Sequence, residues 1–215
     1  MFSPKYLLLL LLICFFSCDK DDTSGVYYFE VNLATVHKVN ESFYFQLDNG
    51  KTLYPVIFQE NLNFYPEDNQ RVLMQYGILL ENNSMYDESI QVYSISNINV
   101  SSIKELTIEN ELLFGSDPIA LESIWISGNY INLSFFIYGD IGVHYVALVE
   151  NTTLTYPDDD TLRLEVRHDA LDDYPAYRKK TMISFDISSL EKGQKLAIKI
   201  NTYDYGEKTY YRIFE

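Results

Sequence analysis

The densest group of chemically active side chains lies between Arg167 and Arg178, where one histidine is followed by three carboxylates. A histidine beside carboxylates can bind a transition metal, but this spacing matches no calcium-binding loop and the stretch holds a single histidine. We therefore predict no metal and expect a structural connection between two strands, in which Arg167 or Arg178 pairs with the acids. Contact with a ligand, or catalysis, is the alternative, and it would involve His168, Asp169, Asp172, Asp173, Tyr174 and Tyr177.

A second acidic run, Asp158-Asp159-Asp160, directly follows Pro157. Adjacent carboxylates of this kind usually mark a solvated loop, and a weak calcium site is the alternative. The tripeptide Asp160-Thr161-Leu162 also resembles the short O-glycosylation motif of exported Bacteroidetes proteins.

The sequence contains no recognisable catalytic arrangement. With 31 acidic residues, carboxylate pairs of the glycosidase kind arise by chance, and His37, His144 and His168 are scattered along the chain. No nucleophile elbow, zinc-protease motif, Walker A loop or dinucleotide-binding glycine pattern is present. We predict that the protein is not an enzyme and uses no cofactor.

Both cysteines, Cys14 and Cys18, lie near the start of the chain. No disulfide, thiolate zinc site or cysteine nucleophile is therefore available after Cys18. An apolar run over residues 7–16 follows Lys5, and as a helix it would span about 15 Å, half of a bilayer core. This pattern predicts a signal peptide over residues 1–17 and not a transmembrane helix.

Ser17 and Cys18 resemble the end of a bacterial lipobox, although Phe15 stands where leucine is usual. In a lipobox the cysteine sulfur takes a diacylglycerol and the chain is cut just before it. The resemblance implies a membrane anchor on Cys18, since two or three acyl chains hold a protein stably on a bilayer. An ordinary signal peptide with a free Cys18 is the alternative.

Residues 18–25 are predicted to form a short acidic tether, rich in aspartate and ending in small residues. Within the tether, Lys20, Asp21 and Asp22 resemble the surface-export signal of Bacteroidetes lipoproteins. We expect an outer-membrane lipoprotein at the cell surface, with the periplasmic leaflet as the alternative.

The whole chain is acidic, with 16 basic against 31 acidic residues and a formal charge of −15. Such a surface repels phosphate backbones, so we predict no nucleic-acid partner. Aromatic residues make up 15% of the chain, and residues of this kind suit half-buried sheets.

From Val26 onwards, alternating apolar and polar residues predict strands and little helix. The pair Asn49-Gly50 predicts a type I′ hairpin turn, and Pro55 predicts a strand end or an edge strand. Residues 102–106 could form a helical turn. This first half holds about five predicted strands.

The turn-forming stretch Gly115-Ser116-Asp117-Pro118 is the predicted domain boundary, with one domain over residues 26–114 and another over residues 115–215. The second half repeats the pattern at hairpin spacing, which predicts about six or seven strands and a β-sandwich. In the strand that follows the Gly128-Asn129 turn, we expect Asn132 and Ser134 to face out, away from the apolar residues that alternate with them.

Taken in order, many of these segments resemble the NigD-like lipoproteins of Bacteroidetes. No single motif is diagnostic; the order and spacing of the segments carry the resemblance, which covers nearly the whole mature chain. The matching stretches are Val31-Asn32-Leu33-Ala34-Thr35-Val36, Leu47-Asp48-Asn49-Gly50, Gln70-Arg71-Val72-Leu73, Asp117-Pro118-Ile119, Ile124-Trp125-Ile126-Ser127-Gly128, Arg167-His168-Asp169-Ala170, Asp172-Asp173, Tyr177-Arg178, Ser184-Phe185-Asp186, Asn201-Thr202-Tyr203-Asp204 and Gly206-Glu207-Lys208-Thr209-Tyr210.

The resemblance implies an N-terminal OB-type barrel and a C-terminal β-sandwich, and it implies no mechanism. OB barrels bind oligomers through one face, on which aromatic side chains stack on bases or sugars. Such side chains more often fill or cover the barrel. The aromatic residues of the first domain are Tyr27, Tyr28, Tyr44, Tyr54 and Phe64-Tyr65.

We therefore expect an all-β protein, an OB-like barrel followed by an antiparallel β-sandwich, held in the envelope by a lipid anchor. Its expected role is that of a non-enzymatic binding or accessory module that contacts a glycan or a protein. The alternative is a protective role in the envelope, such as self-immunity to a bacteriocin, which rests only on the bacteriocin-associated gene cluster that named the family.

Overall fold

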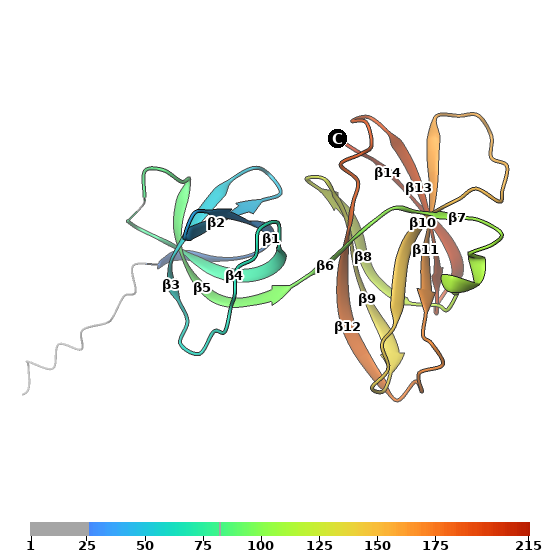
Figure 1. Ribbon diagram of the computed structural model, residues 1–215, viewed down its shortest axis with the longest axis horizontal. Coiled ribbons are helices and arrows are strands. Elements are labelled where there is room, and N and C mark those ends of the chain that lie inside the picture. Colours follow the sequence, from blue (N-terminus) through green and yellow to red (C-terminus); the bar gives the residue numbers. More distant parts are fainter. Residues whose placement is uncertain (1–25, 82) are drawn as a thin grey trace, which may run out of the picture.

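The computed structural model describes residues 26–81 and 83–215 and contains two β domains side by side (Figure 1). A closed barrel comes first and a two-layer sandwich second, which confirms the predicted fold class. The barrel strands are β1 (Val26–Val39), β2 (Ser42–Leu47), β3 (Thr52–Phe58), β4 (Arg71–Leu79) and β5 (Glu88–Asn97). The sandwich contains β6 (Asn99–Ser102), β7 (Lys104–Leu106), a short 3-10 turn η1 (Glu111–Leu113), β8 (Ala120–Ser127), β9 (Tyr130–Gly139), β10 (Tyr145–Asn151), β11 (Thr161–Asp169), β12 (Tyr177–Asp186), β13 (Lys195–Thr202) and β14 (Gly206–Ile213).

The barrel closes in the strand order β1-β2-β3-β5-β4. Closure depends on the long strand β1, which pairs with β4 along its first part and with β2 along its second. Alternate side chains of every strand point inward and fill the barrel. Its fully buried core consists of Ala34, Val36, Phe45, Leu53, Val72, Met74, Tyr76, Ile90 and Val92.

Two local details of the barrel differ from the expectation. The β2–β3 turn is not type I′, because Gly50 has a φ of +88° whereas Asn49 keeps a negative φ. Leu47 N bonds to Lys51 O and Gly50 N to Leu47 O, the pattern of a longer hairpin loop. Pro55 lies inside β3, at a register shift between β3 and β5 where a missing N–H is tolerated.

The sandwich packs a sheet of order β14-β13-β11-β10-β7 against a sheet of order β6-β12-β9-β8. Its hairpin-connected pairs are antiparallel, and the pairs β7–β10, β11–β13 and β6–β12 are parallel. Apolar side chains from both sheets meet between the layers, among them Ile131, Leu133, Phe135, Leu148, Phe185, Ile198 and Phe214.

The domain boundary lies earlier than the sequence predicted. The barrel ends with β5 at Asn97, and β6 and β7 already pair with β12 and β10 of the sandwich. Residues 104–106 therefore form a strand, where a helical turn was expected, because an available strand edge outweighs weak local preference. The turn at residues 115–118 lies within the sandwich domain.

Candidate functional site

Half-buried aromatic rings form a line across the outside of the barrel, which we call the aromatic row: His37, Tyr44, Tyr54 and Tyr86. Strand register places most of them. His37 is the partner of Tyr44, and Tyr44 and Tyr54 flank the buried pair Phe45–Leu53. Since side chains alternate along a strand, these rings point away from the barrel core.

The rings of the aromatic row follow one another at close spacing. Their centroids are 5.2 Å apart from His37 to Tyr44, 5.3 Å from Tyr44 to Tyr86, and 5.1 Å from Tyr86 to Tyr54. The interplanar angles are 26°, 42° and 13° in the same order. At these distances and angles the rings pack on one another and form one continuous aromatic strip.

The sequence singled out Tyr44 and Tyr54 as candidates and missed His37 and Tyr86. Period-2 alternation could have found His37, since Val36 beside it is apolar. Tyr86 precedes β5, outside any strand, and only the tertiary structure brings it between Tyr44 and Tyr54. Of the other predicted aromatics, Phe64 packs on the barrel core and Tyr65 is exposed.

A second line of outward side chains, the polar row, runs beside the aromatic row and consists of Thr35, Gln46 and Thr52. Register pairs Thr35 with Gln46 and Gln46 with Thr52. The backbone N–H and the hydroxyl of Thr52 each donate a 2.7 Å hydrogen bond to Asp87 Oδ2. These bonds hold the pKa of Asp87 below its usual value, so a carboxylate lies next to Tyr86.

The polar row leads into a hollow of about 500 Å³ between the domains, which we call the amide pocket. Thr35 and His37 line its barrel side, and Tyr130 and Lys192 line its sandwich side. Amide groups can both donate and accept hydrogen bonds, as hydroxyl-rich ligands require. The amides in its wall belong to Gln46, Asn49, Asn69 and Asn129.

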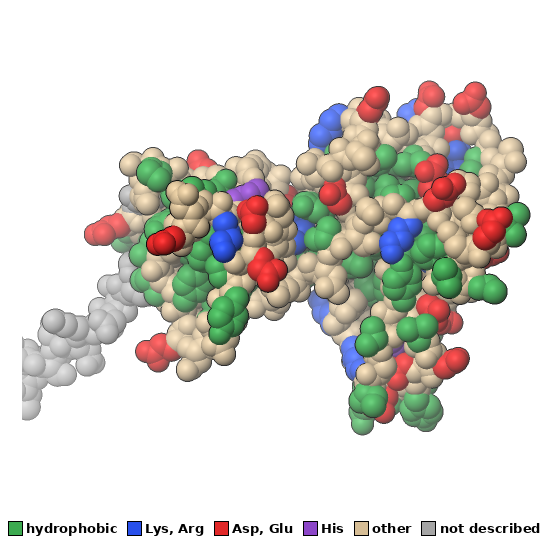
Figure 2. All heavy atoms as spheres, in the orientation of Figure 1, with side chains coloured by type: hydrophobic (Ala, Val, Ile, Leu, Met, Phe, Trp, Pro, Cys, Tyr) green, Lys and Arg blue, Asp and Glu red, His purple; other side chains and the backbone are tan. Residues whose placement is uncertain are grey.

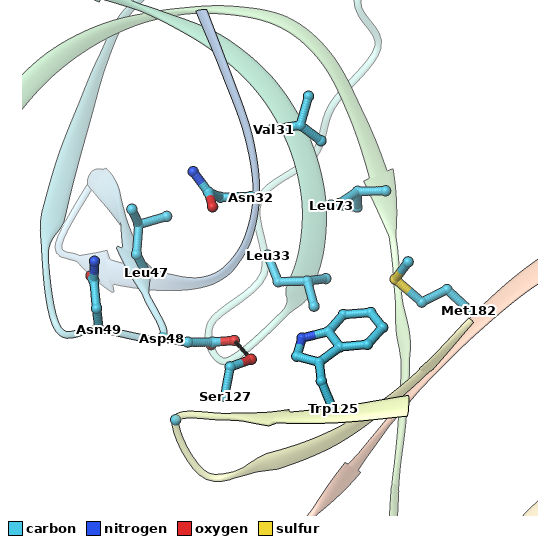
Figure 3. A pocket seen from close by; sticks show the side chains of 11 residues that line it. Val31, Asn32, Leu33, Leu47, Asp48, Asn49, Leu73, Trp125, Ser127 and Met182 are labelled. Atoms are coloured by element: carbon cyan, nitrogen blue, oxygen red, sulfur yellow. Dashed lines mark hydrogen bonds between the residues drawn. The ribbon is translucent and has the colours of Figure 1, made fainter. Parts of the chain in front are cut away.

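A second hollow of about 470 Å³, the tryptophan pocket, shares Asp48 and Gly128 with the amide pocket (Figure 3). Figure 3 shows the ring of Trp125 between Leu33 and Met182. Trp125 is the single tryptophan of the chain, so its fluorescence reports on the domain junction alone.

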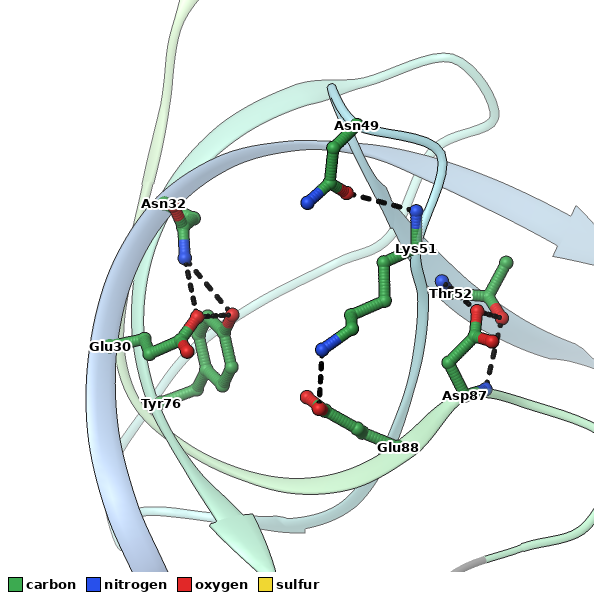
Figure 4. Close-up of polar contacts among 8 residues, drawn as sticks. All are labelled: Glu30, Asn32, Asn49, Lys51, Thr52, Tyr76, Asp87 and Glu88. Carbon is green, nitrogen blue, oxygen red and sulfur yellow. Dashed lines mark hydrogen bonds and ion pairs between the residues drawn. The ribbon is translucent and has the colours of Figure 1, made fainter.

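The side chains of a polar cluster project within the ring of barrel strands (Figure 4). Lys51 Nζ lies 2.5 Å from Glu88 Oε1, and this contact raises the pKa of Lys51. Tyr76 OH donates a hydrogen bond to Glu30 Oε2 at 2.5 Å. Burial is the main cause that raises the pKa of Tyr76, and this bond raises it further. The raised pKa values keep Lys51 protonated and the Tyr76 hydroxyl neutral at neutral pH, so both can donate to their carboxylate partners and brace the barrel.

The two domains are joined by a junction clamp consisting of Arg71, Asp48, Ser127, Asn132 and Ser184. Arg71 Nη1 and Nη2 each lie 2.7 Å from an Asp48 carboxylate oxygen, and the Arg71 side chain is fully buried. Arg71 also donates from Nε to Ser184 Oγ at 3.0 Å and from Nη2 to Asn132 Oδ1 at 3.1 Å. The barrel and sandwich faces that border the pockets are thus fixed relative to each other.

Asn132 and Ser134 face away from the sandwich core, as the sequence predicted, but both are buried and do not reach solvent. Asn132 lies under Arg71 of the other domain, and Ser134 donates to Glu122 Oε2 at 2.5 Å. The outer face of β9 is therefore covered, which strand alternation alone does not reveal.

The predicted ligand loop separates into buried and exposed residues. His168 is 2% exposed, and Asp173 accepts a 2.8 Å bond from Asp140 N. Asp169 accepts from Leu171 N within the loop. Asp172 is exposed, as are Tyr174 and Tyr177. The structure therefore does not bring these six residues together into one site.

The acidic run 158–160 lies on the surface, where Asp159 forms a bidentate pair with Arg163 at 2.6 and 2.9 Å. Thr161, of the tripeptide that resembles a glycosylation motif, begins β11. Within residues 26–81 and 83–215, no cluster of three or more histidine, cysteine or acidic side chains is arranged to bind a metal ion. The predicted signal peptide, Cys18 and the Lys20, Asp21 and Asp22 segment lie outside the described residues.

Comparison with known families identifies the family to which the chain belongs. Residues 33–98 match the NigD-like N-terminal OB domain, and residues 102–213 match the NigD-like C-terminal beta sandwich domain. The chain belongs to the NigD-like family. The two matched regions coincide with the barrel and the sandwich of this NigD-like protein, and they meet near Ile98.

Solved structures share the fold of this NigD-like protein over most of its length. A candidate toxin-related protein of Parabacteroides distasonis is 28% identical, with a TM-score of 0.70 over 86% of this chain and 92% of that one. A NigD-like immunity protein of Bacteroides caccae is 21% identical, with a TM-score of 0.65 over 85% and 91%. A candidate lipoprotein of Bacteroides fragilis is 16% identical, with a TM-score of 0.62 over 87% and 99%.

No curated protein matches the chain at a significant level. Among the described residues, no helix has the length and apolar character needed to cross a bilayer.

Proposed function

We propose that this NigD-like protein is a non-enzymatic binding module, held in the cell envelope by a lipid on Cys18, that contacts a glycan through its barrel. The observation that supports this function is the aromatic row with the polar row and the amide pocket beside it. Aromatic faces stack on the C–H faces of sugar rings, and amides and hydroxyls bond to sugar hydroxyls.

A neutral glycan suits this face better than a charged polymer. The formal charge of −15 disfavours a polyanion, and the groups lining the amide pocket are mostly uncharged. An extended chain of sugars could lie across the rings, because successive rings of the aromatic row are about 5 Å apart. The junction clamp would keep the amide pocket at a constant distance from the row.

The test is binding of the purified protein to an array of bacterial and dietary glycans, followed by variants. Tyr44→Ala and Tyr54→Ala should each weaken binding to the glycan that the wild type selects by about tenfold, since one stacked ring contributes about 1–3 kcal/mol. Tyr205→Ala is the matched control, because Tyr205 is 77% exposed on the sandwich, away from the row. Equal binding by all of these proteins, or the appearance of cleaved glycan, would contradict the proposal.

A protective role against a bacteriocin is the second candidate, and the immunity protein of Bacteroides caccae with the same fold favours it. Under this function, a deletion strain should become sensitive to a toxin from the same gene neighbourhood. Unchanged sensitivity in a strain whose glycan binding is lost would favour the first function.

A further inference from the structure

A buried pair of histidines lies at one end of the sandwich, away from the aromatic row. His144 Nδ1 is 2.8 Å from His168 Nε2, and the two rings stack with centroids 5.0 Å apart. His144 Nε2 is 3.3 Å from Asp173 Oδ2, and His168 Nδ1 is 3.3 Å from the Pro118 carbonyl oxygen. Three hydrogen bonds in series thus run from a carboxylate to a carbonyl.

Counting protons along this series gives its charge. Both terminal atoms are oxygen acceptors, so each of the three bonds takes its proton from an imidazole nitrogen. Two neutral imidazoles have only two N–H groups, one fewer than the bonds require. The series is complete when the pair carries one added proton, whose charge the Asp173 carboxylate balances. A second added proton would set two N–H groups against each other across 2.8 Å.

The surroundings of the pair disfavour the second added proton. Burial, and then the His144 ring, lower the pKa of His168. Burial raises the pKa of Asp173, but bonds from the backbone N–H groups of Asp140 and Gly142 and from His144 outweigh it and leave that pKa below its usual value. Other charged side chains at this end are Asp117, Asp140, Arg167, Asp169, Asp172 and Lys179. Lys179 donates to the Asp140 carbonyl.

The hydrogen-bonded series holds two loops that cross between the sheets: the His144–Asp173 bond joins one loop to the other, and the His144–His168 bond joins the first loop to β11. Residues 140–144 connect β9 to β10, and residues 170–176 connect β11 to β12. The loops touch closely: a Cβ on Gly142 would lie 2.6 Å from Asp173 Cγ, and one on Gly139 would lie 2.6 Å from His144 Nε2. Only glycine leaves room for the carboxylate and the ring at these positions.

The second loop is held in a strained conformation. Leu171 and Asp172 have φ values of +50° and +58°. Non-glycine residues keep such values only where the surrounding contacts hold them. Large apolar side chains on both loops are exposed, with Ile141 at 91% and Tyr174 at 74%. Loss of the tie would let the strained loop relax and rearrange this apolar end of the sandwich.

We propose that His144, His168 and Asp173 form an acid-operated latch. While the pair shares one added proton, the His144–His168 bond holds the loop of residues 140–144 to β11, and a second added proton breaks this bond and frees that loop. This device is independent of the glycan-binding function. The sign follows from linkage: folding lowers the pKa of His168, so its contribution to the closed state is lost as the pH falls below about 6.5, the ordinary value for histidine. The pKa of Asp173 also lies below its usual value, so protonation of this carboxylate weakens the closed state further at lower pH.

Hydrogen exchange of the full-length protein in detergent, corrected for the intrinsic rate, tests the latch. Between pH 7.5 and pH 5 we expect protection of residues 140–144 and 170–176 to fall severalfold, while that of β9 and β11 stays constant. Asp173→Asn should reduce loop protection already at pH 7.5. Asp172→Asn, a change of the exposed neighbouring acid, should behave as the wild type. In the double variant His144→Gln/His168→Gln the pH dependence should disappear.

Two results would overturn the latch: loop protection in the wild type that does not change with pH, or the same acid-induced loss in the double variant. If the double variant does not fold, an NMR titration of the wild type decides. The chain has three histidines, so His37 on the barrel serves as the internal reference. Two rings that titrate together in two coupled steps support the latch, and two independent single-step curves contradict it.

Discussion

Arg71 is the side chain on which the domain junction depends most. It is fully buried and donates to Asp48, Ser184 and Asn132. Removal of one partner from a buried ion pair leaves the other charge without compensation, at a cost of about 3–5 kcal/mol. We therefore expect Arg71→Met to lower the free energy of unfolding by about 3 kcal/mol, measured by urea denaturation.

The matched control for Arg71 is Arg163, which also forms a bidentate pair with an aspartate but on the surface. Arg163→Met should change the stability much less, because water and salt screen an exposed pair. Trp125 fluorescence should respond to Arg71→Met and remain unchanged in Arg163→Met, since Trp125 lies at the junction. Equal losses of stability in both variants would refute the importance of the clamp.

Asp159 allows a prediction about pH at the residue scale. Its bonds to Arg163 lower its pKa to about 2, even though the loop is exposed. A depressed carboxylate pKa means that the pair persists until the pH falls towards this value, and then opens as Asp159 takes up a proton. Carboxyl NMR should show Asp159 titrating near pH 2, and in Arg163→Met its midpoint should move up towards the ordinary value for aspartate.

At the scale of elements, the two hairpin glycines Gly50 and Gly128 provide a matched pair. Both have positive φ, +88° and +53°, so alanine costs about 1 kcal/mol of backbone strain at either position. A Cβ on Gly50 meets nothing within 4 Å, whereas a Cβ on Gly128 would lie 3.2 Å from Asp48 O in the other domain. Gly128→Ala should therefore destabilise the protein more than Gly50→Ala, by about 1 kcal/mol in urea denaturation. Equal losses of stability in the two variants would mean that the β8–β9 hairpin is not in tight contact with the barrel at Gly128.

Strand alternation predicted most of the elements, because a period of two is a local property of the sequence. The segments at residues 70–80 and 87–98 became β4 and β5 with small changes at their ends. Strand β7 was missed because it consists of Lys104–Leu106 and pairs in parallel with β10, far along the chain. No local pattern specifies a strand that is so short.

At the scale of the whole molecule, the proposed lipid anchor depends on a single residue, Cys18. Cys18→Ala should leave the protein unprocessed or soluble, because the acyl chains would be its tie to the bilayer. Detergent-phase partitioning measures this, and a variant that stays in the detergent phase would contradict the anchor. Folding of the two domains should not change, since Cys18 precedes β1.

Surface display is predicted to depend on the neighbouring signal and not on the anchor itself. Replacement of Lys20, Asp21 and Asp22 with alanine should preserve lipidation but keep the protein on the periplasmic side. Protease shaving of intact cells distinguishes the two locations, with the wild type as the control. If protease digests the wild type and the triple variant equally on intact cells, the export-signal prediction is wrong.

The sequence by itself determined the all-β class and the confinement of both thiols to positions 14 and 18, because these follow from alternation and residue type. The order of barrel and sandwich was implied by the resemblance to the NigD-like family and not by alternation. The sequence did not determine what covers the outer faces of the strands. Alternation divides a strand into two faces, but strand order and domain docking decide which face is buried. Arg71 thus meets Asn132, and Tyr86 joins the aromatic row. His144 likewise meets His168 across two strands only in the folded chain, where the sheets bring distant residues within hydrogen-bonding distance.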